Sequence, residues 1–223
     1  MLKLGIDDAG RGPVIGPMVL AGCLIDDKTE KEFKRLGVRD SKQLTEKRRE
    51  FLANLIREKA ETFEVIIITP KEIDHSNKIG IKLNEVEAFA SARIINKINK
   101  GYKKIKVVLD CPSTSIVKWH DFLVSKINNL SNLEISCEHK ADKNHIAVSA
   151  ASILAKSVRE KEMFKLKEEY GQDMGSGYTS DPLTSKFLKR NIKKYNNHDI
   201  FRKTWSTWKN ALGKHEQKRL SEF

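Results

Sequence analysis

Short apolar stretches that end at acidic residues are the feature of this sequence that most limits its fold. Three of them are Leu2–Asp7, Ile105–Asp110 and Leu133–Glu138, and each is rich in the aliphatic and β-branched residues that favour strands. Two more, Met18–Ile25 and Phe63–Thr69, have a similar composition. The pattern predicts five strands, three of which carry a carboxylate at or near their ends.

Helical periodicity fills much of the chain between these strands. Apolar residues recur at helical spacing in Thr45–Ala60, Ile81–Lys100, Ser115–Asn128 and His145–Tyr170. Asp142 precedes the last of these segments at a position where it can cap the helix. Strands that come first and then alternate with helices predict an α/β fold, a mixed sheet flanked by helices.

A turn-rich stretch divides the chain near its C-terminal end. Tyr170–Pro182 is rich in Gly, Ser, Asp and Pro, and it is followed by a basic segment of helical character from Leu183 to about Leu212. We therefore expect a main domain at residues 1–175, a small C-terminal helical segment at residues 176–212, and a flexible polar tail at residues 213–223.

Composition restricts the partners and the location. The formal net charge of +12 over 223 residues suits a protein that attracts a polyanion, most often nucleic acid, although solvated helix faces can carry such an excess too. No apolar run approaches the roughly 20 residues of a membrane-spanning helix, and the N-terminus lacks a signal-peptide core. We expect a cytoplasmic protein. Three widely spaced cysteines predict neither a disulfide framework nor a zinc site.

Two adjacent acids run into a glycine-rich turn between residues 5 and 17. Asp7 and Asp8 occupy neighbouring strand positions, so their side chains point to opposite faces unless the strand ends or bends between them. The glycines that follow permit such a bend. Because adjacent carboxylates repel each other, this arrangement is best tolerated where a divalent cation neutralises it.

Asp110 and Asp142 extend the acid set to four. Asp110 closes a strand and Asp142 precedes a long apolar helix, so four carboxylates can meet at one rim of the sheet. Oxygen-only ligands suit Mg²⁺ or Mn²⁺, and two such ions roughly 4 Å apart would generate a hydroxide and stabilise an in-line phosphoryl displacement. Taken singly, each acid has a structural alternative: Asp110 as a strand end and Asp142 as a helix cap.

Five blocks of the sequence resemble the type 2 ribonuclease H family, ribonuclease HII, in its archaeal-like form. Residues 5–17 are similar to the family signature Asp-Glu-Ala-Gly-Arg-Gly-Pro followed by Gly-Pro. The other blocks are residues 40–44, 107–114, 138–156 and 175–182. They occur in the family's order between residue 2 and about residue 209, so the resemblance covers nearly the whole chain.

This resemblance implies a fold, a reaction and a metal site. It implies a ribonuclease H-like sheet in which Asp7, Asp8, Asp110 and Asp142 are the catalytic residues and hold two Mg²⁺ or Mn²⁺ ions. The implied enzyme is an endonuclease that hydrolyses the RNA strand of RNA–DNA hybrids and cuts 5′ of ribonucleotides embedded in duplex DNA. It would leave 3′-hydroxyl and 5′-phosphate ends, serve ribonucleotide removal and primer removal, and act as a monomer.

The same resemblance implies how substrate is recognised. Gly10, Arg11 and Gly12 would probe the ribose 2′-hydroxyl through backbone groups, with Tyr178 against the sugar at the RNA-to-DNA junction. Only that hydroxyl distinguishes RNA from DNA at a given position, and glycine permits the close main-chain approach needed to read it. Candidate contacts to the nucleic-acid backbone are Ser41, Lys42, Lys143, Ser149, Ser152, Lys156, Arg202 and Lys203.

The chain departs from the family pattern at two positions. Position 8 is Asp where the family has Glu, and one methylene fewer retracts the carboxylate by roughly 1.5 Å against a catalytic tolerance near 0.5 Å. That is enough to change metal occupancy or ion preference. Thr179 stands where the family often has proline, which is expected to loosen the tyrosine loop slightly.

The C-terminal end resembles a peptide that binds the sliding clamp. Gln217, Leu220 and Phe223 have the spacing of Gln-x-x-aliphatic-x-x-aromatic, with one aromatic residue missing. At this spacing the three side chains would form one turn that plugs an apolar pocket, while a disordered polar tail is the alternative.

Two other functions remain open from the sequence. One is a ribonuclease H-like, structure-specific DNA nuclease such as a resolvase, which would not depend on a 2′-hydroxyl. The other is a catalytically weakened nucleic-acid-binding subunit, which would bind without cutting.

Overall fold

The chain folds as two compact units. The computed structural model describes residues 1–39 and 44–220, with side chains as far as residue 213. The first unit comprises Met1–Ala9, Val19–Ile67 and Leu83–Val158, and the second comprises Gly10–Met18, Ile68–Lys82 and the residues from Arg159 onward. Each unit thus combines segments that lie far apart in the sequence.

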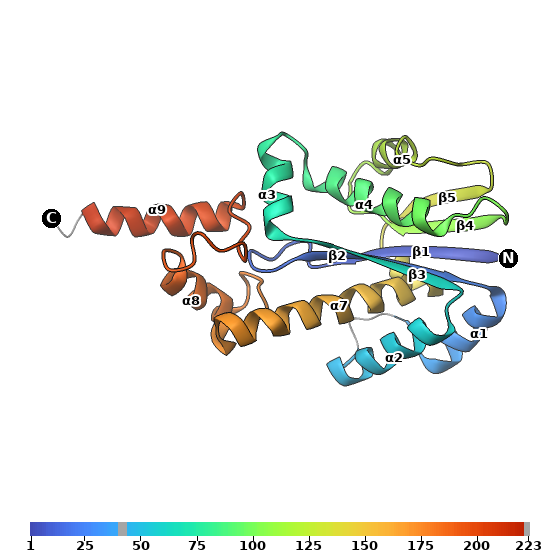
Figure 1. Cartoon of the computed structure of the whole chain (residues 1–223), viewed down its shortest axis with the longest axis horizontal. Coiled ribbons are helices and arrows are strands. Elements are labelled where there is room, and N and C mark those ends of the chain that lie inside the picture. The colour runs from blue at the N-terminus through green and yellow to red at the C-terminus, as the bar shows by residue number, and fades with distance from the viewer. Residues whose placement is uncertain (40–43, 221–223) are drawn as a thin grey trace. The chain divides into compact units, whose positions relative to one another are not determined.

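A five-stranded sheet forms the centre of the first unit. Its strands are β1 (Leu2–Ala9), β2 (Met18–Ile25), β3 (Thr62–Ile68), β4 (Ile105–Asp110) and β5 (Leu133–Glu138). Their order in the sheet is β3-β2-β1-β4-β5 (Figure 1). β1 is antiparallel to β2 and parallel to β4, and β4 is parallel to β5. The five expected strands are present, and the mixed α/β sheet is confirmed.

Helices cover both faces of this sheet (Figure 1). One face carries α1 (Asp27–Leu36), α2 (Glu46–Lys59) and the first part of α7 (Ile146–Tyr170), and the other carries α4 (Leu83–Ile98) and α5 (Ile116–Val124). All eight residues of β2 are buried, as its continuous apolar sequence predicts for a strand covered on both faces.

Two glycines set how closely the helices approach the sheet. A Cβ atom at Gly5 in β1 would collide with the backbone of Ala147 in α7, and one at Gly22 in β2 would collide with Ile94 in α4. The main chain of α7 therefore lies directly against β1, the strand that carries Asp7. This close packing fixes the start of α7 beside the acidic end of the sheet.

The second unit has its own apolar core. It contains the loop Gly10–Met18, α3 (Pro70–Lys78), the end of α7, α8 (Pro182–Asn191) and α9 (Ser206–Leu220). Its buried residues are Val14, Ile15, Met163, Met174, Phe187, Leu188, Ile192, Ile200, Phe201 and Trp208. The loop that follows β1 is thus anchored by its own apolar residues.

The helical predictions are confirmed with shifted ends. Four expected segments correspond to α2, α4, α5 and α7, and the basic C-terminal segment contains two helices, α8 and α9. Three further helices, α1, α3 and the short α6 (Ala141–Asn144), were not predicted from the sequence. Within the described part of the chain, no helix has the length and apolar character needed to cross a membrane.

Candidate active site

β1 carries the first two acids at its end. The strand continues through Asp7 and Asp8 to Ala9, and the two acids pair with Ala21 and Leu20 of β2. The parallel pairing with β4 ends earlier, at Ile6. β1 therefore does not end between the acids, and both lie beyond the last residue of β1 that pairs with β4.

Asp110 ends β4, and Asp142 lies shortly after the end of the neighbouring strand β5. Asp110 is the last residue of β4, and its Oδ1 accepts a hydrogen bond from the Ala141 backbone N–H at 3.0 Å. Lys140 adopts a left-handed conformation with φ of 59° as the chain turns from β5 into α6. This turn places buried Asp142 directly after the residue that holds Asp110.

Three of the four predicted acids line one small pocket. Asp7, Asp8 and Asp110 share it with Glu87 and Ser91 of α4. Asp142 does not line the pocket, but the residue before it, Ala141, donates a backbone hydrogen bond to Asp110, which does. Among the described residues, no three His, Cys, Asp or Glu side chains already stand together as a ready-made set of metal ligands.

The surroundings of Asp7 favour a cation. Burial raises the pKa of Asp7 well above its usual value, and the charges of Asp8 and Asp110 raise it further, while hydrogen bonds from Ser152 and from the Asp8 N–H act in the opposite direction. Buried carboxylates crowded in this way are costly unless a counter-charge joins them. The nearby acids would all bind a cation through carboxylate oxygens, so the residues fit Mg²⁺ or Mn²⁺.

Glu87 is a pocket residue that the sequence analysis did not single out. Its side chain is only 2% exposed, and it lies one helical turn before Ser91, which is equally buried. Both are on α4, on the face that packs against the sheet. The sequence does contain a signal that could have identified Glu87. It lies among the apolar residues on the buried face of a helix, where glutamate is rare unless it has a partner or a function.

The glycine-rich turn belongs to the second unit. Gly10 has φ of 82°, a conformation that favours glycine, and a Cβ atom there would collide with the Arg159 side chain. A Cβ atom at Gly12 would lie 3.7 Å from Cε1 of Tyr178. The structure thus brings the predicted ribose-reading turn and the predicted junction tyrosine together.

Hydrogen bonds join the turn to the tyrosine loop. The Gly177 carbonyl accepts from the N–H groups of Val14 and Ile15 at 3.0 and 3.3 Å. Tyr178 is 37% exposed, and the guanidinium carbon of Arg159 lies 5.1 Å from the centre of its ring. One face of the Tyr178 ring is therefore in contact with Arg159 of the same unit, and part of the side chain is exposed to solvent.

The predicted backbone contacts differ in exposure. Ser149 and Ser152 are buried: Ser149 donates to the Asp142 carbonyl, and Ser152 bonds Asp7. Lys143 is exposed, whereas Lys156 and Lys203 are half-buried. Ser41, Lys42 and Phe223 lie outside the described residues, and the side chains of Gln217 and Leu220 are also outside the description.

Arg202 stands apart from the other basic candidates. Its side chain is completely buried, and its guanidinium donates to main-chain carbonyls of the glycine-rich turn. The structure therefore places Arg202 behind the predicted recognition surface instead of on it.

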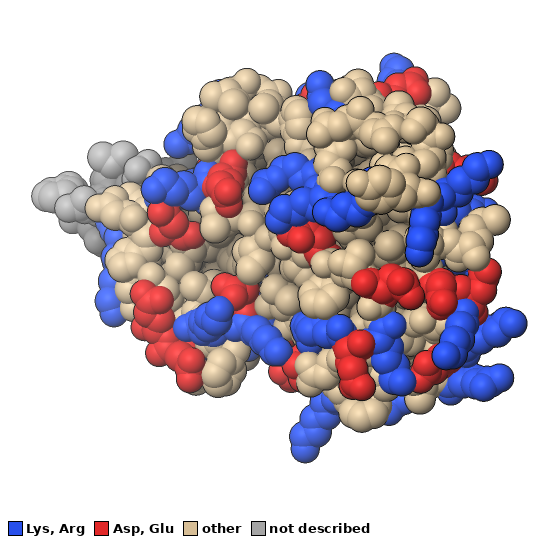
Figure 2. All heavy atoms as spheres, turned by 45° about the vertical axis from the view of Figure 1, so that its right-hand side comes forward, with Lys and Arg blue, Asp and Glu red and all other residues tan. Residues whose placement is uncertain are grey.

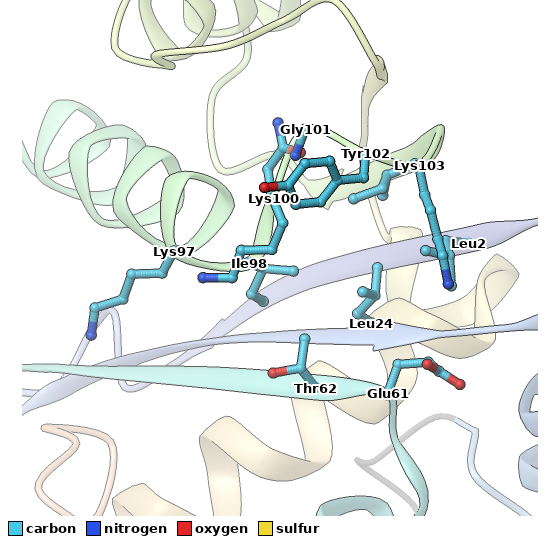
Figure 3. A pocket seen from close by; sticks show the side chains of 12 residues that line it. Leu2, Leu24, Glu61, Thr62, Lys97, Ile98, Lys100, Gly101, Tyr102 and Lys103 are labelled. Atoms are coloured by element: carbon cyan, nitrogen blue, oxygen red, sulfur yellow. The ribbon is translucent and has the colours of Figure 1, made fainter.

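A second pocket of the first unit lies at the other end of the sheet. It has a volume of about 400 Å³ and is lined by Leu2 and Ile105, where β1 and β4 begin, and by Tyr102 (Figure 3). Lysines surround it, and Lys97 among them is paired with Glu64 at 2.7 Å. The acids stand at the opposite ends of these strands, so this pocket is separate from the candidate active site.

Positive and negative side chains are mixed on the face of the molecule drawn in Figure 2. On the face in Figure 2, Lys and Arg side chains alternate with Asp and Glu side chains over the described residues. The net charge of +12 therefore provides a general attraction to polyanions. Local geometry, and not bulk charge, must select the substrate.

A mixed sheet of this order, with acids at the ends of β1 and β4, defines the ribonuclease H-like class of nucleases. The structure matches the crystal structure of ribonuclease H2 from Pyrococcus horikoshii OT3 with a TM-score of 0.85 and 36% identity, covering 96% of this chain and 98% of that one. It matches ribonuclease HII of Archaeoglobus fulgidus, solved as a PCNA:RNase HII complex, with a TM-score of 0.81 and 36% identity over 92% and 96% of the two chains.

Within the ribonuclease H-like class, the sequence of this chain is similar to one family over nearly its whole length. The family model for ribonuclease HII matches residues 4–208. Ribonuclease HII of Methanococcus maripaludis is 41% identical over 99% of this chain and 90% of the relative. The chain belongs to the ribonuclease HII family. It is therefore a ribonuclease H, an endoribonuclease that hydrolyses phosphodiester bonds, and its family depends on divalent metal ions.

Proposed function

We propose that this enzyme cuts 5′ of ribonucleotides embedded in duplex DNA and hydrolyses the RNA strand of RNA–DNA hybrids, leaving 3′-hydroxyl and 5′-phosphate ends. The observation that carries the proposal is the pocket in which Asp7, Asp8 and Asp110 meet, with Asp142 tied to Asp110 through Ala141. Its biological roles would be ribonucleotide removal and primer removal, and it would act as a monomer in the cytoplasm.

Asp7, Asp8, Asp110 and Asp142 would hold two divalent ions, Mg²⁺ or Mn²⁺. When bound, the ions supply activation of water and neutralisation of charge at the reacting phosphate. The protein's part is to hold the carboxylates in place. The Ala141 N–H fixes Asp110, Ser149 fixes the backbone at Asp142, and Ser152 donates to Asp7.

Recognition of the ribose would come from the turn and the tyrosine loop. The backbone of Gly10, Arg11 and Gly12 would contact the 2′-hydroxyl, and Tyr178 would lie against the sugar at the junction. A Cβ atom added at Gly12 would lie 3.7 Å from the Tyr178 ring, and this supports the assignment, because the missing side chain leaves space for a sugar beside both.

Residues 176–212 would act as a substrate-binding segment beside a catalytic part formed by residues 1–175. Exposed Lys143 and half-buried Lys156 and Lys203 are the described lysines proposed to contact phosphates. Buried Ser149 and Ser152 act through the acids that they contact. Ser41 and Lys42 remain predicted contacts.

The tail would bind the sliding clamp through Gln217, Leu220 and Phe223. The solved complex of the Archaeoglobus fulgidus relative with PCNA supports this proposal, because that relative shares 36% identity with the present chain.

One assay tests the proposed function. Labelled duplexes with a single ribonucleotide, with a continuous RNA strand or with no RNA are incubated with Mg²⁺ or Mn²⁺. We expect cutting of the first two and none of the third, and an Asp110→Asn variant should lose at least roughly 100-fold in rate. Equal cutting of the all-DNA duplex would instead indicate a structure-specific DNA nuclease, and binding without cutting would indicate a non-catalytic subunit.

A further inference from the structure

Arg202 makes an unusual set of contacts for an arginine in a nucleic-acid enzyme. Its side chain is 0% exposed, and the guanidinium donates to three carbonyls of one turn. Nη1 donates to the Arg11 carbonyl at 2.6 Å, Nη2 to the Gly10 carbonyl at 2.5 Å, and Nε to the Gly16 carbonyl at 3.2 Å. A planar fork of donors suits several fixed acceptors, which the single ammonium of lysine cannot match.

The backbone around Arg202 fixes this fork in position. The Arg202 N–H donates to the Val14 carbonyl at 2.9 Å, and the Gly16 N–H donates to the Ile200 carbonyl at the same distance. The ring of Trp205 lies 5.2 Å from the guanidinium carbon. The segment around Arg202 and the turn are thus joined through both main chain and side chain within the second unit.

Peptide geometry links these carbonyls to the groups that would read the substrate. In a planar trans peptide, the C=O of one residue and the N–H of the next point in opposite directions. The Gly10 carbonyl shares its peptide with the Arg11 N–H, and the Arg11 carbonyl shares its peptide with the Gly12 N–H. Because both carbonyls point at the guanidinium, both N–H groups point away from it.

The positive charge also affects the strength of these N–H groups. A charge-assisted hydrogen bond to a carbonyl polarises the whole peptide, which makes its N–H a better donor. Arg202 therefore aligns two successive peptides and strengthens their donors. These are peptides of the turn that the proposed function assigns to ribose recognition.

We propose that Arg202 is a positioning residue that directs the Arg11 and Gly12 amide groups at the ribose 2′-hydroxyl, and so sets the discrimination between RNA and DNA. The proposal rests on the proposed function. It gives Arg202 no contact with substrate and assigns its effect to the two peptides that it holds.

A binding comparison tests this inference without catalysis. The affinities of the full chain for an all-DNA duplex and for the same duplex with one ribonucleotide are measured in EDTA. We expect Arg202→Lys to reduce the preference for the ribonucleotide by about fivefold to tenfold, the value of roughly one hydrogen bond. Its affinity for the all-DNA duplex should change by less than about twofold, because that duplex offers no 2′-hydroxyl.

A matched control separates positioning from general stability. Phe187 lies in the core of the same unit, so Phe187→Leu should lower the melting temperature without altering the preference. Trp205→Leu keeps the arginine but removes the ring that helps to hold its guanidinium against the carbonyls, so it should reduce the preference to an intermediate degree. This second variant retains the test if Arg202→Lys does not fold.

The outcomes distinguish the inference from the proposed function. A wild-type enzyme with no preference for the ribonucleotide duplex and no ribonucleotide-dependent cutting overturns the proposed function. A wild-type preference that persists in Arg202→Lys overturns the inference alone, as does an equal loss of preference in Phe187→Leu. In the cleavage assay, a higher KM of Arg202→Lys for the ribonucleotide duplex, in step with its weaker binding, supports positioning.

Discussion

Asp8 is one methylene shorter than the glutamate of the family pattern, and its neighbours suggest how the pocket accommodates it. Buried Glu87 of α4 lines the same pocket as its fourth carboxylate, beside Asp7, Asp8 and Asp110. Aspartate and glutamate carry the same charge, so the shorter side chain changes the position of the carboxylate and not the charge available for cations. Asp8 thus affects the geometry of the site more than its net charge.

We predict that Asp8→Glu raises the rate with Mg²⁺ by up to about tenfold or leaves it unchanged. A carboxylate that extends further restores the geometry of the family pattern, and misplacement by about 1 Å can cost up to 100-fold in rate. The measurement is single-turnover cleavage of the one-ribonucleotide duplex at several Mg²⁺ and Mn²⁺ concentrations. A large loss with both ions would show that the pocket has adapted to aspartate.

Asp7 should make the stability of the folded protein depend on pH, which can be measured without an activity assay. Burial and the charges of Asp8 and Asp110 raise the pKa of Asp7 in the folded protein, whereas an unfolded aspartate has a pKa of roughly 4. The folded state then holds its proton more tightly, so stability falls as pH rises from the unfolded pKa through the folded pKa. At neutral pH and without metal, the burial and crowding that raise the pKa of Asp7 therefore destabilise the fold.

We predict that Asp7→Asn raises the melting temperature in EDTA at pH 7, by roughly 2–4 °C for each kcal/mol relieved. This gain should shrink as pH falls toward 4. Added Mg²⁺ or Mn²⁺ should stabilise the wild type more than the variant, because a bound ligand stabilises only the state that binds it. Thermal unfolding with and without metal measures both effects. A lower melting temperature for the variant in EDTA contradicts the prediction.

At the residue scale, the sequence correctly predicted which acids lie together where they stand at the ends of neighbouring strands. Asp7, Asp8 and Asp110 could be placed together because strand ends meet at one edge of a sheet. Glu87 and the position of Arg202 could not, because their burial depends on which helix or loop packs over them. An arginine in a basic segment looks like a phosphate contact until its carbonyl partners are known.

Among the elements, the strands were predictable because their apolar content is continuous. β2 is apolar or glycine throughout and buried throughout. By contrast, α1 buries only Phe33, and α3 contains a single aliphatic residue, Ile73. Their apolar periodicity is too sparse to mark a helix, so capping residues carry the signal instead: Asp26 caps α1, and Thr69 forms a capping box in α3.

The contact between β1 and α7 is the closest packing that positions the acids. A Cβ atom at Gly5 would collide with the Ala147 backbone, which cannot move aside as a flexible side chain can. We predict that Gly5→Ala destabilises the protein by about 1–3 kcal/mol, the usual cost of overpacking. Denaturant unfolding measures this change.

The same substitution at Gly213 is the control. An added Cβ atom there has no neighbour within 4 Å, and alanine favours the helix, so Gly213→Ala should be neutral or stabilising by up to about 1 kcal/mol. Comparable losses in the two variants would refute the role of the close contact. Gly5→Ala should also slow cleavage, since any outward shift of α7 moves Ser152 relative to Asp7.

At the scale of the whole molecule, the net charge and the proposed clamp contact of the tail act outside the active site. A net charge of +12 favours binding to nucleic acid of any sequence, and this attraction weakens as salt increases. The proposed reading of the ribose by the turn would be local, and we expect it to depend much less on salt. We therefore attribute general affinity to the surface and selectivity to the Gly10–Gly12 turn.

We expect the tail to increase affinity for the sliding clamp without changing the rate of cleavage. If Gln217, Leu220 and Phe223 engage the clamp, deletion of residues 217–223 should lower affinity for the clamp by at least about tenfold, since one aromatic anchor residue can contribute 2 kcal/mol or more. The rate on a short ribonucleotide duplex without clamp should stay the same. A Gln217→Ala, Phe223→Ala double variant tests the side chains while keeping the chain length. Calorimetric titration with a sliding clamp measures the affinity, and unchanged binding in both variants would mean that the tail does not carry the contact.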